Sequence, residues 1–319
     1  MSIAKNILSF IHMMSLPQDE CEVYCREKRL ERYEKSGGHI SHLRLHSAAH
    51  RVLIPLMKAD LFLGGKRLHI VQDNRLKTLR PVIFCPTHIG GVDIEMAIEA
   101  VKTPCWVVIG DPRELYKGLD GMLLQMNGWI PMDVLVKKDR AAAKAQMSEL
   151  LRQGGSMLMF PEGVQNISPN ALLGHLYAGA VELAITCDAE IVPIAIARRG
   201  DHYYFNIGRN IHYDGCSIAD RFQLTENLRD RMATLLWELI EQFPRSRRKD
   251  IPKTIYEDYL KSVLTLNTEY SFTVEDILAT QFHPKGITAQ MEAFAFMGKL
   301  IPKKENAFLF DKRQKGLPF

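Results

Sequence analysis

The spacing of apolar residues predicts helices at both ends of the chain. In residues 3–14, apolar side chains recur every three or four positions, as they do on one face of a helix. Ser15 and Pro17 predict the start of a second, highly charged helix that ends at Gly37, and a third helical segment follows at residues 39–63. Pro55 lies inside the third segment and is expected to interrupt it. The same period returns in residues 225–243, where a threonine is the candidate N-cap. We therefore expect helical N-terminal and C-terminal extensions.

The middle of the chain instead contains short runs rich in β-branched and aromatic residues. Five of them predict strands: Val82–Cys85, Trp106–Ile109, Met157–Phe160, Ile191–Ile196 and Tyr203–Ile207. Helical patterns at residues 92–101, 141–151 and 172–186 separate most of these runs. Strands that alternate with helices predict an α/β fold with a layered, mixed and largely parallel sheet and flanking helices. The last two strands are close enough in sequence to pair antiparallel at an edge of the sheet.

Composition and charge fit a folded protein in three parts. Hydrophobic residues make up 46% and charged residues 24% of the chain, which excludes a disordered or collagen-like protein. The patterns divide the chain into a helical region at 1–78, an α/β domain at 79–215 and a helical extension at 216–319. The net charge is +4, and residues 243–319 hold 13 Lys and Arg against 9 Asp and Glu, so this tail carries the whole excess. Such a tail favours an anionic surface or an acidic partner over nucleic acid.

The first candidate site follows the strand at residues 82–85. A Gly-rich segment there contains Thr87, His88 and Asp93, and a helical pattern follows it. Open α/β sheets bind ligands at the carboxyl ends of their strands. A carboxylate at one imidazole nitrogen stabilises the protonated ring and leaves the other nitrogen to accept a proton. The alternative interpretation is a turn histidine with an aspartate that caps the helix.

A second strand ends in a similar way. Residues 157–160 lead directly into Pro161, Glu162 and Gly163, where the proline sets a turn and the glycine lets a backbone N–H approach a ligand. Alone, this segment would be a common turn with an exposed glutamate. Together, polar residues at the ends of two strands predict a cleft.

These residues resemble the motifs of the glycerolipid acyltransferase family, the lysophosphatidic-acid acyltransferase group. In that family a His-x4-Asp motif is followed by a Gly-x-Ile segment, by Phe-Pro-Glu-Gly and by a strand with Val-Pro. The matching segments here are His88/Asp93, Gly128–Pro131, Phe160–Gly163 and Ile191–Ile194. The resemblance covers about residues 79–210.

The resemblance implies transfer of a fatty acyl group from an acyl thioester, carried by coenzyme A or acyl-carrier protein, to a hydroxyl of a lysophospholipid or related lipid. It makes His88 the general base and Asp93 its orienting partner. It also makes Glu162 the residue that positions the acceptor, with an oxyanion donor in the backbone near Gly163. No metal and no cofactor beyond the acyl carrier is implied. The candidate substrate-binding residues are Thr87, Gly128, Lys137, Lys138, Arg140, Pro161 and Gln165.

The chain departs from the family pattern at three positions. Val134, Gln165 and Tyr177 stand where family members that use phosphate-bearing acceptors usually carry cations. Either the basic residues at 137–140 substitute for them, or the acceptor is not a simple glycerol phosphate. The joint loss of three cations slightly favours the second alternative.

Other functions are also compatible with the sequence. The same chemistry could serve an amine, a glycolipid or another amphiphile, and the same fold could bind lipid without catalysis. A thioester hydrolase would release fatty acid without an acceptor. His39, His42, His46 and His50 recur at the spacing of metal-binding helices, although a polar or membrane-facing helix surface is the simpler interpretation.

The membrane relationship is also predicted from the pattern. No apolar run reaches the roughly 18 to 20 residues that span a bilayer. Residues 1–16 either lie in the membrane interface or pack on the protein. We expect a peripheral or monotopic protein on the cytoplasmic face of the membrane. Its expected partners are a lipid acceptor and acyl-CoA or acyl-carrier protein, with no nucleic acid.

Overall fold

The structure is a computed structural model that describes most of the chain. The described residues are 11–40, 42–110, 113–117, 119–168, 171–266, 273–283, 301 and 303–304. The chain forms two units, Met1–Phe282 and His283–Phe319, and the sheet, its helices and the candidate site all belong to the first unit. Most of the helix predicted at residues 3–14 lies outside the described residues.

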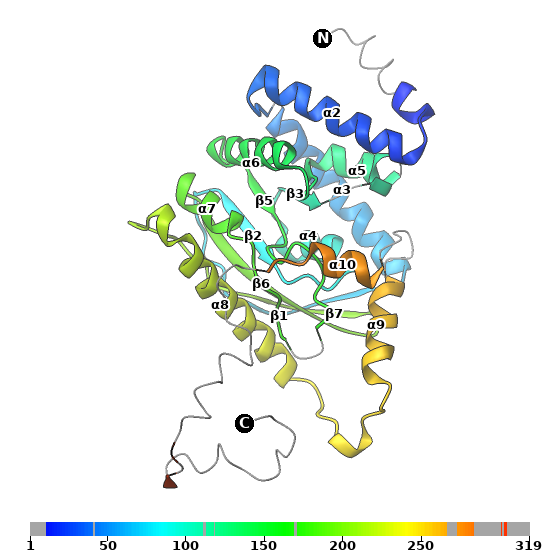
Figure 1. Ribbon diagram of the computed structural model, residues 1–319, viewed down its shortest axis with the longest axis vertical. Helices are drawn as coiled ribbons and strands as arrows, with labels where there is room; N and C mark the ends of the chain where they lie inside the picture. Colours follow the sequence, from blue (N-terminus) through cyan, green and yellow to red (C-terminus); the bar gives the residue numbers. More distant parts are fainter. Residues whose placement is uncertain are drawn as a thin grey trace. The chain divides into compact units, whose positions relative to one another are not determined.

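One seven-stranded sheet forms the centre of the first unit (Figure 1). Its strands are β1 Arg67–Asp73, β2 Val82–Pro86, β3 Cys105–Gly110, β4 Trp129–Met132, β5 Ser156–Leu158, β6 Glu190–Arg199 and β7 His202–Ile207. Their order across the sheet is β1-β7-β6-β2-β5-β3-β4. All neighbours from β6 to β4 are parallel, β7 is antiparallel to β6, and β1 is parallel to β7. The α/β fold with a mixed, largely parallel sheet is thus confirmed.

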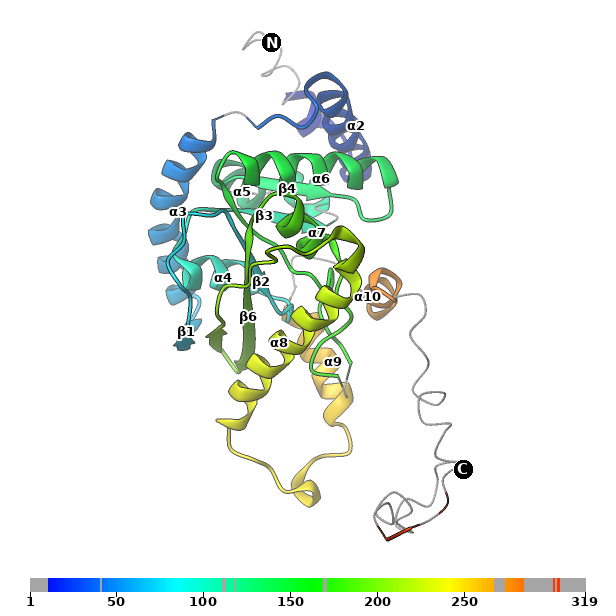
Figure 2. The ribbon, with the colours of Figure 1, turned by 90° about the vertical axis from the view of Figure 1, so that its left-hand side faces the viewer.

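Helices cover both faces of this sheet (Figure 2). The α-helices are α2 Gln18–Ser36, α3 Leu43–Leu63, α4 Asp93–Val101, α5 Leu119–Asn127, α6 Lys137–Arg152, α7 Gly179–Thr186, α8 Arg221–Glu241, α9 Ile255–Leu266 and α10 Val274–Thr280. Helices α6, α7 and α8 pack on one face, and α3 and α4 pack on the other. Successive strand residues therefore enter different cores, with Ile83 and Met157 in the first and Phe84 and Leu158 in the second. No helix in the described ranges is both long and apolar enough to cross a bilayer.

All five predicted strands are present, but the pattern does not predict β1 or β4. The four residues of β4 include Pro131, which is tolerated because β4 is an edge strand and a proline there need not donate to the ladder. The second half of β1 is exposed, which weakens its apolar signal. Because β1 pairs with β7, the β6–β7 pair is antiparallel as predicted but does not form the edge. The division of the chain at residues 79 and 215 stays a prediction.

Helices α3, α7 and α8 differ from their predicted extents. α3 continues through Pro55, whose exposed ring lies on the solvent side of the helix. Because proline has no N–H, the carbonyl one turn before it has no partner in the helix, and on this side it can bind water. α8 begins at Arg221, so Thr225 lies inside the helix and not at its cap. α7 begins only at Gly179, because backbone groups within residues 173–177 bond instead to the segment that follows β5.

Candidate active site

The loops after β2 and β5 meet at the carboxyl edge of the sheet. β2 pairs with both neighbours, with Phe84 opposite Leu158 and Pro86 opposite Ile194. Because these strands are parallel, the loops that follow them leave the sheet at the same edge. The N–H of Met159 extends this pairing with a hydrogen bond of 3.0 Å to the carbonyl of Phe84. The fold therefore brings the two candidate motifs together.

His88 and Asp93 form a hydrogen-bonded pair in the loop after β2. His88 Nδ1 lies 2.8 Å from Asp93 Oδ2. That oxygen also accepts the backbone N–H groups of Ile89 at 2.9 Å and Gly90 at 2.8 Å. Gly90 and Gly91 have φ angles of 81° and 69°, which residues with a Cβ rarely adopt, so they make the turn that closes the pair. Asp93 is also the first residue of α4, where the helix dipole stabilises a carboxylate.

The surroundings of His88 favour its protonated form. Burial lowers the pKa of His88, but the charge and hydrogen bond of Asp93 and the charge of Glu162 outweigh burial, so the pKa lies above its ordinary value. Because Asp93 accepts from Nδ1, the neutral ring carries its hydrogen there, and Nε2 is the nitrogen that can accept a proton. The ring is 20% exposed and packs on Phe160, with the centroids 4.4 Å apart. This arrangement is that of a general base and its orienting carboxylate.

Glu162 is buried and joins the two halves of the site. Its Oε1 accepts the backbone N–H of His88 at 2.9 Å, and its Oε2 accepts the backbone N–H of Gly174 at 2.8 Å. Burial raises the pKa of Glu162, whereas these two hydrogen bonds and the charges of His88 and Arg229 oppose the rise. The geometry supports a positioning role, because both carboxylate oxygens have backbone partners. Direct contact of Glu162 with the acceptor stays a prediction.

Arg229 of α8 supports this arrangement and is absent from the residues that the sequence predicts. Its guanidinium donates to the carbonyl of Gly174 at 2.8 Å and to that of Leu173 at 3.0 Å. The pattern of α8 gives no signal for this contact, because only the tertiary fold places that helix beside the loop. Arg229 thus anchors the segment that supplies one of the two partners of Glu162.

Gly163 closes a tight turn after β5. Its N–H donates to the carbonyl of Phe160 at 3.0 Å, and its φ is 77°. A Cβ at this position would lie 2.6 Å from the ring of Tyr177. The N–H of Tyr177 donates in turn to the carbonyl of Pro161 at 2.8 Å. Since the Gly163 amide is already bonded within the turn, its use as an oxyanion donor requires the turn to rearrange and stays a prediction.

A cavity of about 310 Å³ lies beside His88. Its apolar wall includes Leu236 and Ile240 of α8 and Phe243 just beyond that helix. Tyr259 of α9 closes another side, and its hydroxyl donates to the carbonyl of Asn166 at 2.6 Å. Elements on the C-terminal side of the α/β domain therefore help to form the candidate site.

The end of β6 makes one side of this cavity basic. Arg198 and Arg199 both line it, and Nη1 of Arg198 is buried with no hydrogen-bond partner among the described residues. Burial raises the pKa of the neighbouring Tyr203, whereas the charge of Arg198 and a hydrogen bond with Arg198 lower it. The Arg199 guanidinium lies 4.8 Å from the centroid of the Phe243 ring. An anion in the cavity would give Nη1 of Arg198 a partner.

Three of the predicted binding residues have structural contacts at the site. The hydroxyl of Thr87 accepts the N–H of Ile196 at 2.9 Å, which ties the end of β2 to β6. Pro161 supplies the carbonyl bonded to Tyr177, and Gln165 is buried. Of the three, Thr87 also lines the cavity beside His88.

Gly128 lies away from His88. It precedes the first residue of β4 and so lies at the amino edge of the sheet, whereas His88 lies at the carboxyl edge. Its φ is 100°, and a Cβ there would lie 2.6 Å from the Trp106 ring. The structure supports a packing role for Gly128, and its role in substrate binding stays a prediction.

The predicted cations Lys137, Lys138 and Arg140 lie in the first turn of α6 and are exposed. Because α6 begins shortly after β4 ends at Met132, Lys137 lies on the side of the carboxyl edge of the sheet. Burial raises the pKa of Tyr177 and the charge of Arg140 lowers it, so Arg140 approaches the ring beside Gly163. None of the three cations is among the described residues that line the cavity beside His88.

The four histidines at helical spacing do not converge. His46 Nδ1 lies 3.0 Å from the carbonyl of Met126, and His50 Nδ1 lies 2.6 Å from Asn127 Oδ1. Within the described ranges, no group of three or more His, Cys, Asp or Glu side chains is placed to hold a metal ion.

Comparisons with known proteins find similarity to acyltransferases. Residues 67–197 match the model of the family described as Acyltransferase. A 1-acyl-sn-glycerol-3-phosphate acyltransferase of Borreliella burgdorferi is 20% identical over 188 residues, which cover 58% of this chain and 74% of that protein. A solved structure, the 1-acyl-sn-glycerophosphate (LPA) acyltransferase PlsC from Thermotoga maritima, is similar with a TM-score of 0.48 and 12% identity. That similarity covers 76% of this chain and 90% of that one. The matched segment, residues 67–197, is an acyltransferase-family segment and includes His88, Asp93 and Glu162.

Proposed function

We propose that this acyltransferase moves a fatty acyl group from an acyl thioester of coenzyme A or acyl-carrier protein to a hydroxyl of a phosphate-bearing lysolipid. The observation that carries the proposal is the 2.8 Å hydrogen bond between His88 Nδ1 and Asp93 Oδ2, beside a cavity with basic and apolar walls. The name of the B. burgdorferi relative, a 1-acyl-sn-glycerol-3-phosphate acyltransferase, supports the same substrate class.

The chemistry follows from the free nitrogen of His88. Nε2 takes the proton of the acceptor hydroxyl as its oxygen attacks the thioester carbonyl, while Asp93 stabilises the imidazolium that forms. The tetrahedral intermediate collapses, the carbon–sulfur bond breaks, and the proton on Nε2 passes to the departing thiolate. No covalent enzyme intermediate forms. Glu162 acts by holding the backbone of His88 in place.

The head group of the acceptor is proposed to bind at the end of β6. Arg198 offers a buried nitrogen without a partner among the described residues, and Arg199 lies on the rim of the same cavity. These two cations could replace those that the family carries at positions matched here by Val134, Gln165 and Tyr177. The first turn of α6 is the competing location for the phosphate.

A membrane surface is proposed to deliver the lipid. α3 carries large apolar side chains that are exposed along one stripe, namely Leu45, Val52, Leu56 and Leu63. The exposed cations Arg44 and Arg51 each adjoin a residue of this stripe. An apolar stripe beside cations is typical of a helix that lies in the interface of an anionic membrane, which supports peripheral association with the cytoplasmic face.

The first experiment compares wild type with His88→Ala in a transfer assay with labelled acyl-CoA and lysophosphatidic acid. We expect the variant to lose transfer by about 100-fold or more, the usual effect of removing a general base. His39→Ala, which changes an exposed histidine outside the site, is the matched control. Equal transfer by wild type and His88→Ala would contradict the mechanism. Release of free fatty acid without an acceptor would indicate a hydrolase.

A second experiment locates the head group. Arg198→Gln is compared with the double variant Lys137→Gln/Lys138→Gln on lysophosphatidic acid and on an uncharged monoacylglycerol. We expect Arg198→Gln to raise KM at least tenfold for the phosphate-bearing acceptor and little for the uncharged one. The opposite ranking of the two variants would place the phosphate at α6. Transfer only to amines or glycolipids would contradict a phosphate-bearing lysolipid as the acceptor.

A further inference from the structure

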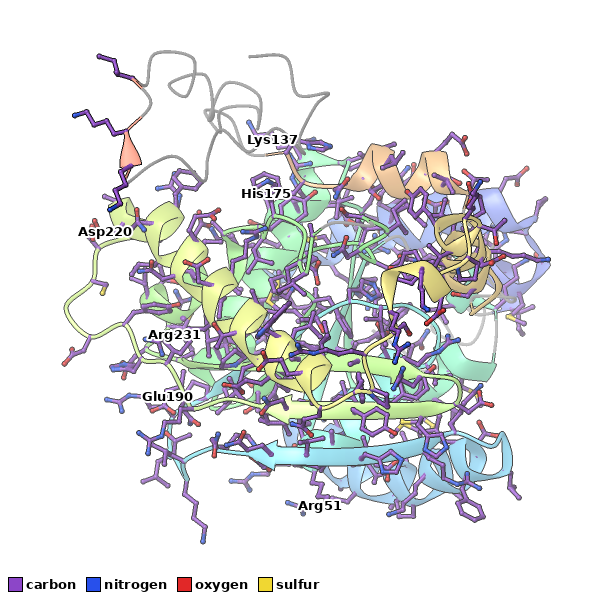
Figure 3. All side chains as sticks on the ribbon, turned by 90° about the horizontal axis from the view of Figure 1, so that it is seen from below. Arg51, Lys137, His175, Glu190, Asp220 and Arg231 are labelled. Carbon is purple, nitrogen blue, oxygen red and sulfur yellow. The ribbon has the colours of Figure 1, made fainter. Side chains whose placement is uncertain are left out.

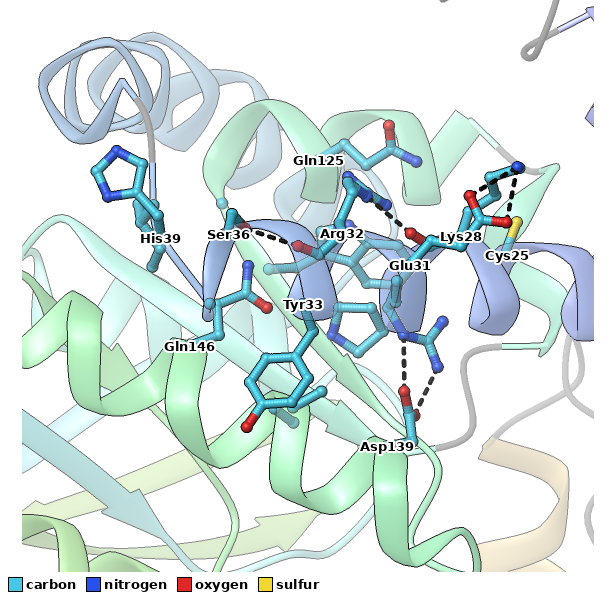
Figure 4. Close-up of a pocket in the computed structure, with 18 of the residues that line it drawn as sticks. Cys25, Lys28, Glu31, Arg32, Tyr33, Ser36, His39, Gln125, Asp139 and Gln146 are labelled. Atoms are coloured by element: carbon cyan, nitrogen blue, oxygen red, sulfur yellow. Dashed lines mark hydrogen bonds and ion pairs between the residues drawn. The ribbon is translucent and has the colours of Figure 1, made fainter.

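A second and larger cavity, of about 1200 Å³, lies beneath α2 (Figure 4). Its walls come from α2, the start of α3, β3, β4 and α6. It shares no described lining residue with the cavity beside His88. α2 precedes residue 67, where the acyltransferase match begins, so this cavity depends on a part of the chain outside that match.

Two ion pairs hold α2 over this cavity. Arg26 Nη1 lies 2.7 Å from Asp133 Oδ2, and Arg29 contacts Asp139 with both Nη2 at 2.6 Å and Nε at 3.2 Å. Asp139 is almost fully buried, so its pairing with Arg29 is protected from solvent. The cavity is therefore bounded by a helix that is ion-paired to residues after β4 and at the start of α6.

The charge of the lining is not balanced. α2 contributes Lys28, Arg29, Arg32 and Lys35, while the lining carboxylates are Glu31 and Asp139. Lys28 pairs with Glu31 at 3.0 Å, and Arg29 pairs with Asp139. Arg32 and Lys35 form no ion pair with any described residue, and the Nε of Arg32 donates only to the Lys28 carbonyl at 3.2 Å. In Figure 4, Arg32 lies on the same side of α2 as Gln125 and away from Asp139. Two cations are thus left for an anion.

The inner wall of the cavity is apolar. Trp106, Trp129 and Ile40 line it, and Trp106 is only 8% exposed. The indole Nε1 of Trp106 is buried without a hydrogen-bond partner among the described residues. Gly128 packs against this nitrogen, so Trp106 presents the face of its ring and not its N–H to the cavity. Aromatic and aliphatic walls suit a hydrocarbon chain.

One wall of the cavity comes from the helix proposed to contact the membrane. His42, which precedes α3, and His46 of α3 line the cavity, and Leu45 between them begins the exposed apolar stripe. A molecule in the outer part of a bilayer could therefore enter without crossing open water. This access favours a lipid over a water-soluble nucleotide.

We propose that the cavity beneath α2 binds a single-chain anionic amphiphile, separately from the catalytic cavity. Its carboxylate or phosphate contacts Arg32 and Lys35, and its hydrocarbon chain lies along Trp106 and Trp129. A long-chain fatty acid anion and a lysophosphatidate share this chemistry. The site goes beyond the proposed acyl transfer and does not require it.

The tryptophans provide a direct measurement. Trp106 and Trp129 are two of the three tryptophans in the chain, and Trp237→Phe removes the third. In that background, a brominated stearate is titrated while indole fluorescence is recorded. We expect saturable quenching, with a Kd at least tenfold higher in the Arg32→Gln/Lys35→Gln variant. Ala143→Leu, which fills part of the lined volume, is expected to weaken binding as well. Arg152→Gln, which changes an exposed cation of α6 outside the lining, is the control for loss of a surface charge.

The outcomes separate this site from the catalytic one. His88→Ala should lose transfer but keep quenching, so failure of the proposed reaction leaves this inference testable. Competition with unlabelled palmitate and lysophosphatidate shows which amphiphile binds more tightly. Equal quenching by the methyl ester of the probe, with no effect of the Arg32/Lys35 change, would overturn the proposal. So would displacement by coenzyme A alone, or loss of quenching in Arg198→Gln.

Discussion

The carboxylate of Glu162 lies 2.9 Å from the backbone nitrogen of His88 and so supports the residue proposed as the base. Its second oxygen binds the amide of Gly174, whose carbonyl is held by Arg229. A continuous set of hydrogen bonds therefore runs from α8 to the loop after β2. In this arrangement, the glutamate of Phe-Pro-Glu-Gly accepts a hydrogen bond from the backbone of the proposed base and holds that backbone in place.

Changing Glu162 to Gln should damage both stability and activity. An amide keeps only one oxygen, so one of the two backbone N–H groups would face an NH2 group with no acceptor. We expect unfolding in urea to become easier by about 1–3 kcal/mol, the usual effect of an unsatisfied buried donor. We also expect kcat/KM to fall at least tenfold. Glu241→Gln, an exposed position, is the control. An unchanged kcat/KM in Glu162→Gln would remove the positioning role.

The pH dependence should report the raised pKa of His88. A general base must be neutral, so kcat/KM should rise with pH through a midpoint above the ordinary value of 6.5. Asp93→Asn removes the charge that raises this pKa, so the midpoint should move to lower pH while the plateau falls by about 100-fold or more. Initial rates measured from about pH 5 to about pH 9 check both the midpoint and the plateau. A midpoint that is unmoved in Asp93→Asn would assign the titration to another group.

The same shift has a consequence for stability. A histidine whose folded pKa is raised stabilises the protein fully below its unfolded pKa, and this contribution is lost as pH rises through the folded pKa. The difference in unfolding free energy between wild type and His88→Gln should therefore shrink from mildly acidic to alkaline pH. Urea unfolding at several pH values measures it. A difference that grows with pH would mean that the folded pKa is lowered.

Arg229 should affect the base without touching substrate. Its charge lowers the pKa of Glu162, so Arg229→Gln should favour protonated Glu162 and weaken one of the charges that raise the pKa of His88. We expect kcat/KM to fall about tenfold, as expected for the loss of more than 1 kcal/mol, and the acid limb to move to lower pH. Arg231→Gln on the same helix is the control, because Arg231 is exposed (Figure 3). A lower rate with an unchanged acid limb would indicate only a structural role.

Gly163→Ala should be destabilising for two separable reasons. The φ of 77° is strained for any residue with a Cβ, typically by about 1–3 kcal/mol. The added Cβ would also lie 2.6 Å from the ring of Tyr177. Tyr177→Leu in the same chain should relieve the contact but not the backbone strain, so it should restore only part of the lost stability. A double-mutant cycle by urea unfolding measures the coupling; strictly additive effects would mean that the two residues do not contact each other.

Local patterns were sufficient for much of the fold and part of the site. Alternating strand and helix signals predicted the α/β class, because a buried parallel strand needs an apolar run and a covering helix on either face. The closeness of His88 and Asp93 was also predictable. They are five residues apart, and the two glycines between them permit the positive φ angles that close the turn.

Contacts between distant segments were decided only by the tertiary structure. Arg198 and Arg229 carry no motif, and they matter because β6 and α8 pack beside the loop after β2. Gly128 belongs to a motif but lies at the opposite edge of the sheet from His88, since motif order along a chain does not specify which end of a strand a residue occupies. Sequence determined which residues can form a base, a turn or a strand, because those properties depend on near neighbours. Packing determined which side chains share a cavity, because that depends on groups far apart in the chain.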